Sequence, residues 1–188
     1  MNSFEFIMVL VSIIIGLGIA ELLKTLSKII RGNHEGGLLH ILWSMNMLNM
    51  LIQCFWAYWV YEDRVDWTYN ELILILLGPI IMYIIASLLY IPNDRYNKLD
   101  EYFINHRLPF FLLFLSLMIV FTFNDYVFTK GDFSRHLVRG TAFTLFGFLA
   151  YTKSRVLHIS GAILFILIQG FFIFNWSFIL STLEAYKI

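Results

Sequence analysis

Long runs of apolar residues without a charged side chain constrain this chain more than any other feature. Residues 6–20, 38–61, 72–90, 108–124 and 156–183 contain no Asp, Glu, Lys or Arg. An apolar run of about 18 residues or more matches the ~30 Å hydrocarbon core of a bilayer at a helical rise of 1.5 Å per residue. Charged residues make up 14% of the chain, whereas a soluble domain has roughly a quarter. The sequence therefore predicts an all-α integral membrane protein.

We predict a compact bundle of about six transmembrane helices that forms one domain over residues 1–188, because the connections are too short to fold separately. The predicted spans are residues 4–23, 38–61, 71–90, 108–123, 136–151 and 156–183. The apolar part of 136–151 is short. If this segment enters the membrane and returns on the same side, the chain makes five full crossings.

Two connections carry helical signals of their own. Residues 24–31 continue the first span as a helical extension, and Gly32, Gly36 and Gly37 then end it. Residues 99–104 are expected to form a short interfacial helix ahead of the fourth span.

The distribution of Lys and Arg predicts the orientation, because cytoplasmic connections carry an excess of these residues. Eight of the 13 lie on one side, and five lie on the other at Arg64, Lys130, Arg135, Arg139 and Lys187. The eight are Lys24, Lys28, Arg31, Arg95, Lys98, Arg107, Lys153 and Arg155. Both termini are therefore expected on the non-cytoplasmic side of a cell membrane, such as a bacterial inner membrane. The eight residues form a basic surface that fits anionic lipid or, alternatively, a phosphate-rich ligand or cytoplasmic protein.

Small residues recur at four-residue spacing in the first span. Ser12, Gly16 and Ala20 form a stripe, the small-residue stripe, against which another backbone can pack closely. Packing inside one bundle is the favoured interpretation, and a surface that faces a pore or another subunit is the alternative.

Three amides follow one face of the second span. Asn46, Asn49 and Gln53 lie near the middle of the membrane, where an unpaired amide costs several kcal/mol. Gln169 is the only amide near the middle of the last span and is a plausible partner for them. These amides form either the wall of a polar path or hydrogen bonds that hold helices together.

Catalytic, metal and cofactor signals are weak. The single Cys54 excludes an intramolecular disulfide, and no H-E-x-x-H, G-x-S-x-G or C-x-x-C motif is present. His40 and His158 at matching depth suit a haem, but interfacial polar residues explain them better. No charged residue lies in the middle third of a predicted span, unlike in proton-coupled carriers and voltage sensors. We therefore expect neither an enzyme nor a resident metal or cofactor, and nothing indicates direct nucleic-acid binding.

The sequence predicts a homo-oligomeric pore or ion channel that self-associates around an axis lined by the amides, gated from the cytoplasm by a partner or an anionic ligand. A non-conducting scaffold or sensor that recruits a cytoplasmic partner, such as one in a bacterial defence system, is the first alternative. A carrier of a neutral or lipid-like molecule is the second.

Overall fold

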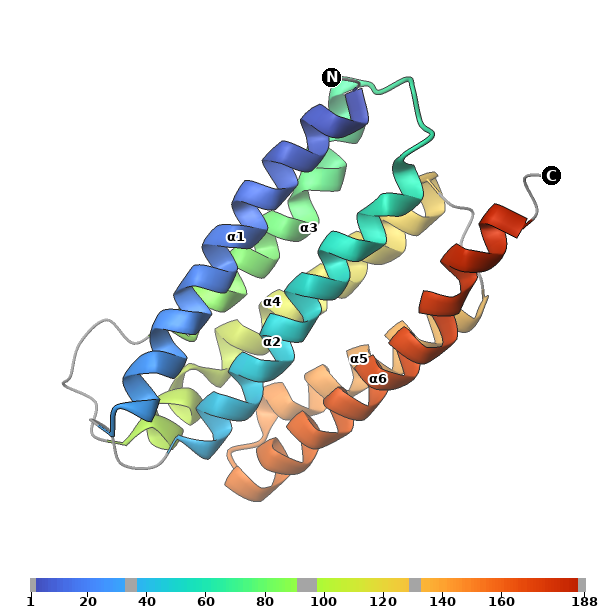
Figure 1. Ribbon diagram of the computed structural model, residues 1–188. Helices are drawn as coiled ribbons and strands as arrows, with labels where there is room; N and C mark the ends of the chain where they lie inside the picture. The colour runs from blue at the N-terminus through green and yellow to red at the C-terminus, as the bar shows by residue number, and fades with distance from the viewer. Residues whose placement is uncertain (1–2, 33–36, 91–97, 129–132, 186–188) are drawn as a thin grey trace.

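A computed structural model describes residues 3–32, 37–90, 98–128 and 133–185, with side chains described to residue 174 except at 134. Within these residues the chain is helical and contains no β-strand. The elements are α1 (Ser3–Ile30), α2 (Leu38–Ala57), the 3-10 turn η1 (Tyr58–Tyr61), α3 (Tyr69–Leu88), α4 (Leu99–Phe128), α5 (Phe133–Tyr151) and α6 (Arg155–Ala185). Successive helices run in alternating directions, and α6 leans away from α2 toward its C-terminal end (Figure 1).

In the part of the chain that the structure describes, five helices are long and apolar enough to cross a membrane. They are α1, Leu38–Tyr61 (α2 with η1), α3, α4 and Arg155–Phe174 of α6. This confirms a multi-pass helical membrane protein. The predicted span 136–151 is the exception, because α5 carries Arg135, Arg139 and two threonines and is not among the five. It is nevertheless one uninterrupted helix that packs against α4 and α6 (Figure 1).

The fourth helix starts earlier than the sequence suggested. It begins at Leu99 and continues through Pro109, so the separate interfacial helix at 99–104 is wrong. Proline removes the N–H that would bond the carbonyl four residues earlier, here that of Asn105. Asn105 and Pro109 are both exposed, so this carbonyl lies on the outer side of the helix, where loss of its donor is tolerated. The 24–31 extension is continuous with α1, and Gly32 and Gly37 adopt positive φ of 78° and 114° on either side of the next connection. Gly36 lies outside the described residues.

Aromatic rings fill the centre of the bundle between α2, α4, α5 and α6. Trp43 of α2 is 0% exposed, and its ring lies within about 6.5 Å of those of Phe103, Phe110, Phe111, Phe114, Phe146 and Phe165. On the other side, Gly18 of α1 lets its helix approach Leu51 and Ala86 closely. The bundle is thus packed around α2.

One carboxylate joins three connections at the end of the bundle opposite Ser3. Asp100 Oδ1 accepts hydrogen bonds from the backbone N–H groups of Gly37 (3.2 Å) and Leu39 (3.1 Å). Asp100 Oδ2 lies 2.7 Å from Arg155 Nη2. Asp100 therefore caps α2 from a distance and ties the starts of α2, α4 and α6 together.

Candidate functional site

Gln169 of α6 meets the three amides of α2. Its Oε1 accepts from Asn49 Nδ2 at 2.9 Å and from Gln53 Nε2 at 3.2 Å. Its Nε2 donates to Asn46 Oδ1 at 2.9 Å. These four residues form the amide cluster, and the structure brings all of them together in the contact between α2 and α6.

Asn46 is the most enclosed member of the amide cluster. It is 0% exposed, and its Nδ2 donates to the carbonyls of Leu42 (2.9 Å) and Ala162 (3.1 Å). Its donors and its acceptor are therefore satisfied within one chain. This arrangement matches hydrogen bonding between helices more closely than an open polar path at Asn46.

Gln53 and Gln169 also face a cavity of about 190 Å³. This polar cavity lies between α2 and η1 on one side and α4, α5 and α6 on the other, in the half of the bundle that holds the start of α1 and the end of α6. Its wall consists of Met50, Gln53, Cys54, Ala57, Tyr58, Val60, Tyr61, Met118, Phe121, Asn124, Asp125, Arg135, Val138, Arg139, Ala142, Phe165, Ile168, Gln169 and Phe172. For scale, an engineered cavity of about 150 Å³ holds a benzene molecule.

An ion pair lies in the wall of the polar cavity. Arg139 Nη1 of α5 is 2.7 Å from Asp125 Oδ2 of α4, and the two side chains are 15% and 9% exposed. Arg135 lies one helical turn before Arg139 and faces the same cavity. From the sequence, Arg139 was placed among the five basic residues on the side opposite the basic surface, and no partner was assigned to it. The signal that could have found the pair is the i, i+4 spacing of the two arginines just across a short connection from Asp125.

Asn124 adds a polar atom to the same wall. The residue is 5% exposed, and its buried Oδ1 accepts no hydrogen bond from the residues that the structure describes. A buried acceptor without a donor costs roughly 1 to 3 kcal/mol. The polar side of the cavity is thus not fully satisfied by the described protein groups.

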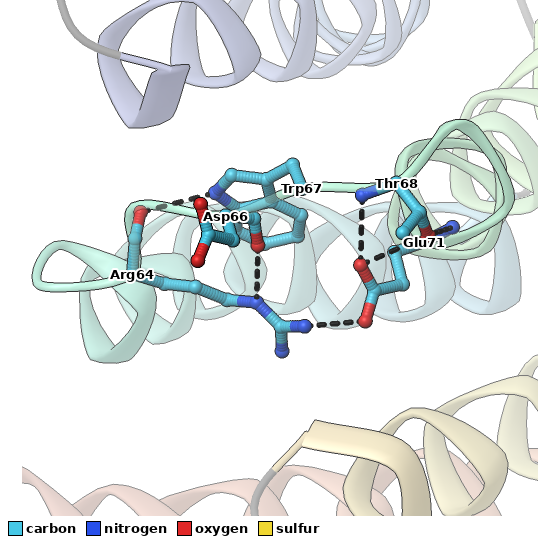
Figure 2. Close-up of polar contacts among 5 residues, drawn as sticks. All are labelled: Arg64, Asp66, Trp67, Thr68 and Glu71. Carbon is cyan, nitrogen blue, oxygen red and sulfur yellow. Dashed lines mark hydrogen bonds and ion pairs between the residues drawn. The ribbon is translucent and has the colours of Figure 1, made fainter.

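The chain between α2 and α3 is held in place beside this cavity. Figure 2 shows Arg64 paired with Glu71, while Glu71 Oε2 accepts from the backbone N–H of Thr68 at 2.9 Å in a capping box that starts α3. The Arg64 guanidinium lies 4.9 Å from the rings of both Trp67 and Phe128. Since the Tyr61 ring in the cavity wall contacts both of these rings, the connection and the cavity wall form one packed unit.

The small-residue stripe does not pack inside the bundle. Ser12, Gly16 and Ala20 are all exposed, and a Cβ at Gly16 would meet nothing within 4 Å among the described atoms. The favoured interpretation of packing within one bundle is therefore wrong. The larger side chains of the opposite face, such as Val11 and Leu22, are buried instead, because they fill more space between α1 and its neighbours.

The predicted basic surface is partly neutralised. Lys24 lies 3.3 Å from Glu21, Lys28 lies over the Tyr90 ring and Arg155 pairs with Asp100. Among the rest, the half-buried Arg107 donates to the Ile104 carbonyl, Arg31, Lys98 and Lys153 are exposed, and Arg95 lies outside the described residues. The net positive charge of this surface is therefore smaller than its number of Lys and Arg residues suggests.

The two histidines considered for haem bind backbone carbonyls. His40 Nε2 lies 2.7 Å from the Leu89 carbonyl and His158 Nε2 lies 3.0 Å from that of Thr152. In the described part of the chain, His, Cys, Asp and Glu form no group of three or more able to hold a metal ion.

Comparison of the chain with protein-family models, with curated proteins and with solved structures gave no match. The contacts within the chain are therefore the basis for assigning a function.

Proposed function

We propose that this chain is a multi-pass membrane protein that binds a small amphiphilic molecule in the polar cavity, as a carrier or as a sensor that responds to it. The observation that carries the proposal is the composition of the cavity wall. Within one space of about 190 Å³ it changes from methionine and phenylalanine to amides and an ion pair. Ligand pockets combine such apolar walls with a few convergent polar groups.

The free-energy cost of burying polar groups inside the bundle supports the same proposal. Ionisable residues inside a membrane bundle are expensive, and they commonly face a pathway or a bound molecule. Asp125 and Arg139 are largely buried, and both line this cavity together with the amides Gln53 and Gln169. A molecule with a polar end and an apolar body complements both parts of the wall.

The proposal is tested by filling the cavity. Val138 of α5 lines it, whereas the adjacent Leu137 is 57% exposed on the outside of the helix. Purified wild type is screened by thermal denaturation against small alcohols, carboxylates and amines that share a phenyl or octyl body. We expect at least one class to raise the melting temperature of wild type and of Leu137→Phe, but not of Val138→Phe. Equal responses of the two variants would place binding elsewhere and refute the proposal.

A homo-oligomeric pore is the second candidate, and the outward position of the small-residue stripe favours it. Small residues on an exposed membrane face allow a second copy to pack closely. A pore lined by the amide cluster would also require α6 to move away from α2, because Gln169 holds the amides within one subunit. In planar bilayers, the triple change of Asn46, Asn49 and Gln53 to Leu abolishes conductance with the oligomer intact if the amides line a pore. Loss of assembly instead would identify the amides as contacts that stabilise the bundle.

The membrane topology is part of the proposal. We propose that α5 completes six crossings, with both termini outside and the basic surface in the cytoplasm of a bacterial cell, facing anionic lipid or a phosphate-rich or protein partner. The hydroxyls of Thr141 and Thr144 donate to backbone carbonyls of α5 itself, and Arg139 pairs with Asp125, so the polar groups of this helix are compatible with lipid around the bundle. In a Cys54→Ser background, labelling of Lys153→Cys from the inside and of Asp63→Cys from the outside is expected. The reverse pattern would invert the topology.

A further inference from the structure

We infer that the molecule bound in the polar cavity is an uncharged hydroxyl compound, an alcohol or a phenol whose body is one ring or a short chain. Its hydroxyl donates to Asn124 Oδ1 and accepts from the hydroxyl of Tyr61, two groups of the cavity wall. This inference rests on the proposed function and specifies the chemistry of its ligand.

The charged groups of the cavity wall already have partners within the chain. Arg139 pairs with Asp125 at 2.7 Å, and Arg135 likewise makes an interaction with another group. An ionic ligand would therefore enter a largely buried site that holds no unpaired counter-charge for it, and the loss of its hydration would not be offset. The wall thus favours an uncharged ligand.

The side-chain oxygen of Asn124 calls for a hydrogen-bond donor. The residue is 5% exposed and lines the cavity, and its buried Oδ1 accepts no hydrogen bond from the described residues. Buried side-chain acceptors in folded proteins nearly always have a hydrogen-bond partner. The O–H of a molecule in the cavity supplies this donor, whereas a carboxylate, an ether or a hydrocarbon has none. An ammonium group also donates, but it brings an unpaired charge into the site.

The hydroxyl of Tyr61 provides the complementary group at the same end of the cavity. Tyr61 lines the wall, and its hydroxyl lies in the electrostatic field of Asp125, the residue that follows Asn124. Within the described part of the chain this hydroxyl makes no hydrogen bond. A tyrosine hydroxyl donates one hydrogen bond and also accepts. One O–H group on the ligand therefore satisfies both residues, because it accepts from Tyr61 and donates to Asn124.

The size of the cavity and its apolar wall limit the rest of the ligand. The apolar part of the wall includes Met118, Phe121, Phe165 and Phe172. The volume of about 190 Å³ is slightly larger than the roughly 150 Å³ of a cavity that holds benzene. One ring or a short alkyl chain with its hydroxyl fits, and the two acyl chains of a phospholipid do not.

The experiment compares ligands of similar shape that differ in donor and charge, on the full-length protein in detergent. Phenol and benzyl alcohol are each titrated beside their methyl ethers, which keep the oxygen acceptor but lack the O–H. Toluene, benzoate and benzylamine complete the series, and calorimetry against detergent blanks gives the dissociation constants. We expect at least one hydroxyl compound to bind about tenfold more tightly than its ether, which is equivalent to about 1.4 kcal/mol, and more tightly than either ion.

Two substitutions separate the roles of the polar groups. Asn124→Leu removes the acceptor, so the hydroxyl compound is expected to lose its advantage over the ether while toluene still binds. Tyr61→Phe removes a donor that both compounds use, so both should bind more weakly and their ratio should stay near that of wild type. Asn105→Leu is the matched control, because Asn105 also lies in α4 but is exposed and does not line the cavity. The melting temperature of each unliganded variant shows that it is folded.

The outcomes separate the two proposals. If the ethers bind wild type as tightly as the hydroxyl compounds, or if benzoate or benzylamine binds best, the inference of an uncharged donor is wrong while the amphiphile site stands. A wild-type preference for the hydroxyl that Asn124→Leu retains would overturn the role of Asn124. If no compound binds the wild type, both proposals fail.

Discussion

Arg139 and Asp125 form an ion pair between consecutive helices, with 2.7 Å between Nη1 and Oδ2 and side chains that are 15% and 9% exposed. The pair fixes α5 against α4 in the wall of the polar cavity. Removing one partner of a buried pair leaves the other charge uncompensated, which costs more than removing both. A change to either residue therefore alters both the stability of the bundle and the charge of the cavity wall.

Arg139→Gln is expected to destabilise the protein by about 3 kcal/mol, because the Asp125 carboxylate loses its counter-charge in a poorly hydrated site. The measurement is the free energy of unfolding in detergent by denaturant titration. The double variant Asp125→Asn/Arg139→Gln serves as the control and should recover most of the loss. A double variant as unstable as the sum of the two single ones would mean that the residues do not interact.

Gln169→Leu is expected to destabilise the bundle more than Asn49→Leu. Loss of Gln169 removes the partner of all three amides of α2, whereas loss of Asn49 leaves the bonds of Gln169 to Gln53 and Asn46 in place. Each interhelical hydrogen bond in a membrane contributes roughly 0.6 to 2 kcal/mol. Thermal denaturation ranks the two variants, and equal losses would contradict the central position of Gln169.

Gly161→Ala is expected to lower stability, while Gly16→Ala leaves it unchanged or raises it. A Cβ at Gly161 would lie 2.7 Å from Leu149 Cδ1, and Leu149 is buried in the contact of α5 with α6, whereas a Cβ at Gly16 meets nothing within 4 Å. Alanine is the better helix former of the two by about 1 kcal/mol, so the sign of each effect reports the local space. A fall in melting temperature for Gly16→Ala would show that another copy covers the small-residue stripe.

Asp100→Ala is expected to loosen the end of the bundle opposite Ser3. The substitution removes the cap on the backbone N–H groups of Gly37 and Leu39, worth about 1 kcal/mol. Loss of the pair with Arg155 adds little, because that arginine is 56% exposed. Hydrogen exchange of the Leu39 amide should accelerate, with Glu101→Gln as the neighbouring control. Unchanged exchange at Leu39 would mean that the cap does not protect this end.

Local chemistry was enough to place the apolar parts of the helices and to anticipate one contact. Uncharged runs such as 38–61 must form helices because lipid offers no partner for backbone polar groups. The same rule implied that Asn46, Asn49 and Gln53 need a partner, and Gln169 was the only amide available in the last span. The ion pair between Arg139 and Asp125 was not predicted from the sequence, because it depends on which face of α5 turns toward α4.

The sequence by itself determined the class of the protein, its five strongly apolar helices and the requirement of its buried amides for hydrogen-bond partners. The period of a helix and the free-energy cost of an unpaired amide are local properties, so both can be read from the sequence. The tertiary structure decided that α4 continues through Pro109, that the small-residue stripe faces outward and that a cavity lies beside Gln53 and Arg139. These outcomes depend on how side chains from distant segments share space, and one helix considered alone carries no information about its neighbours.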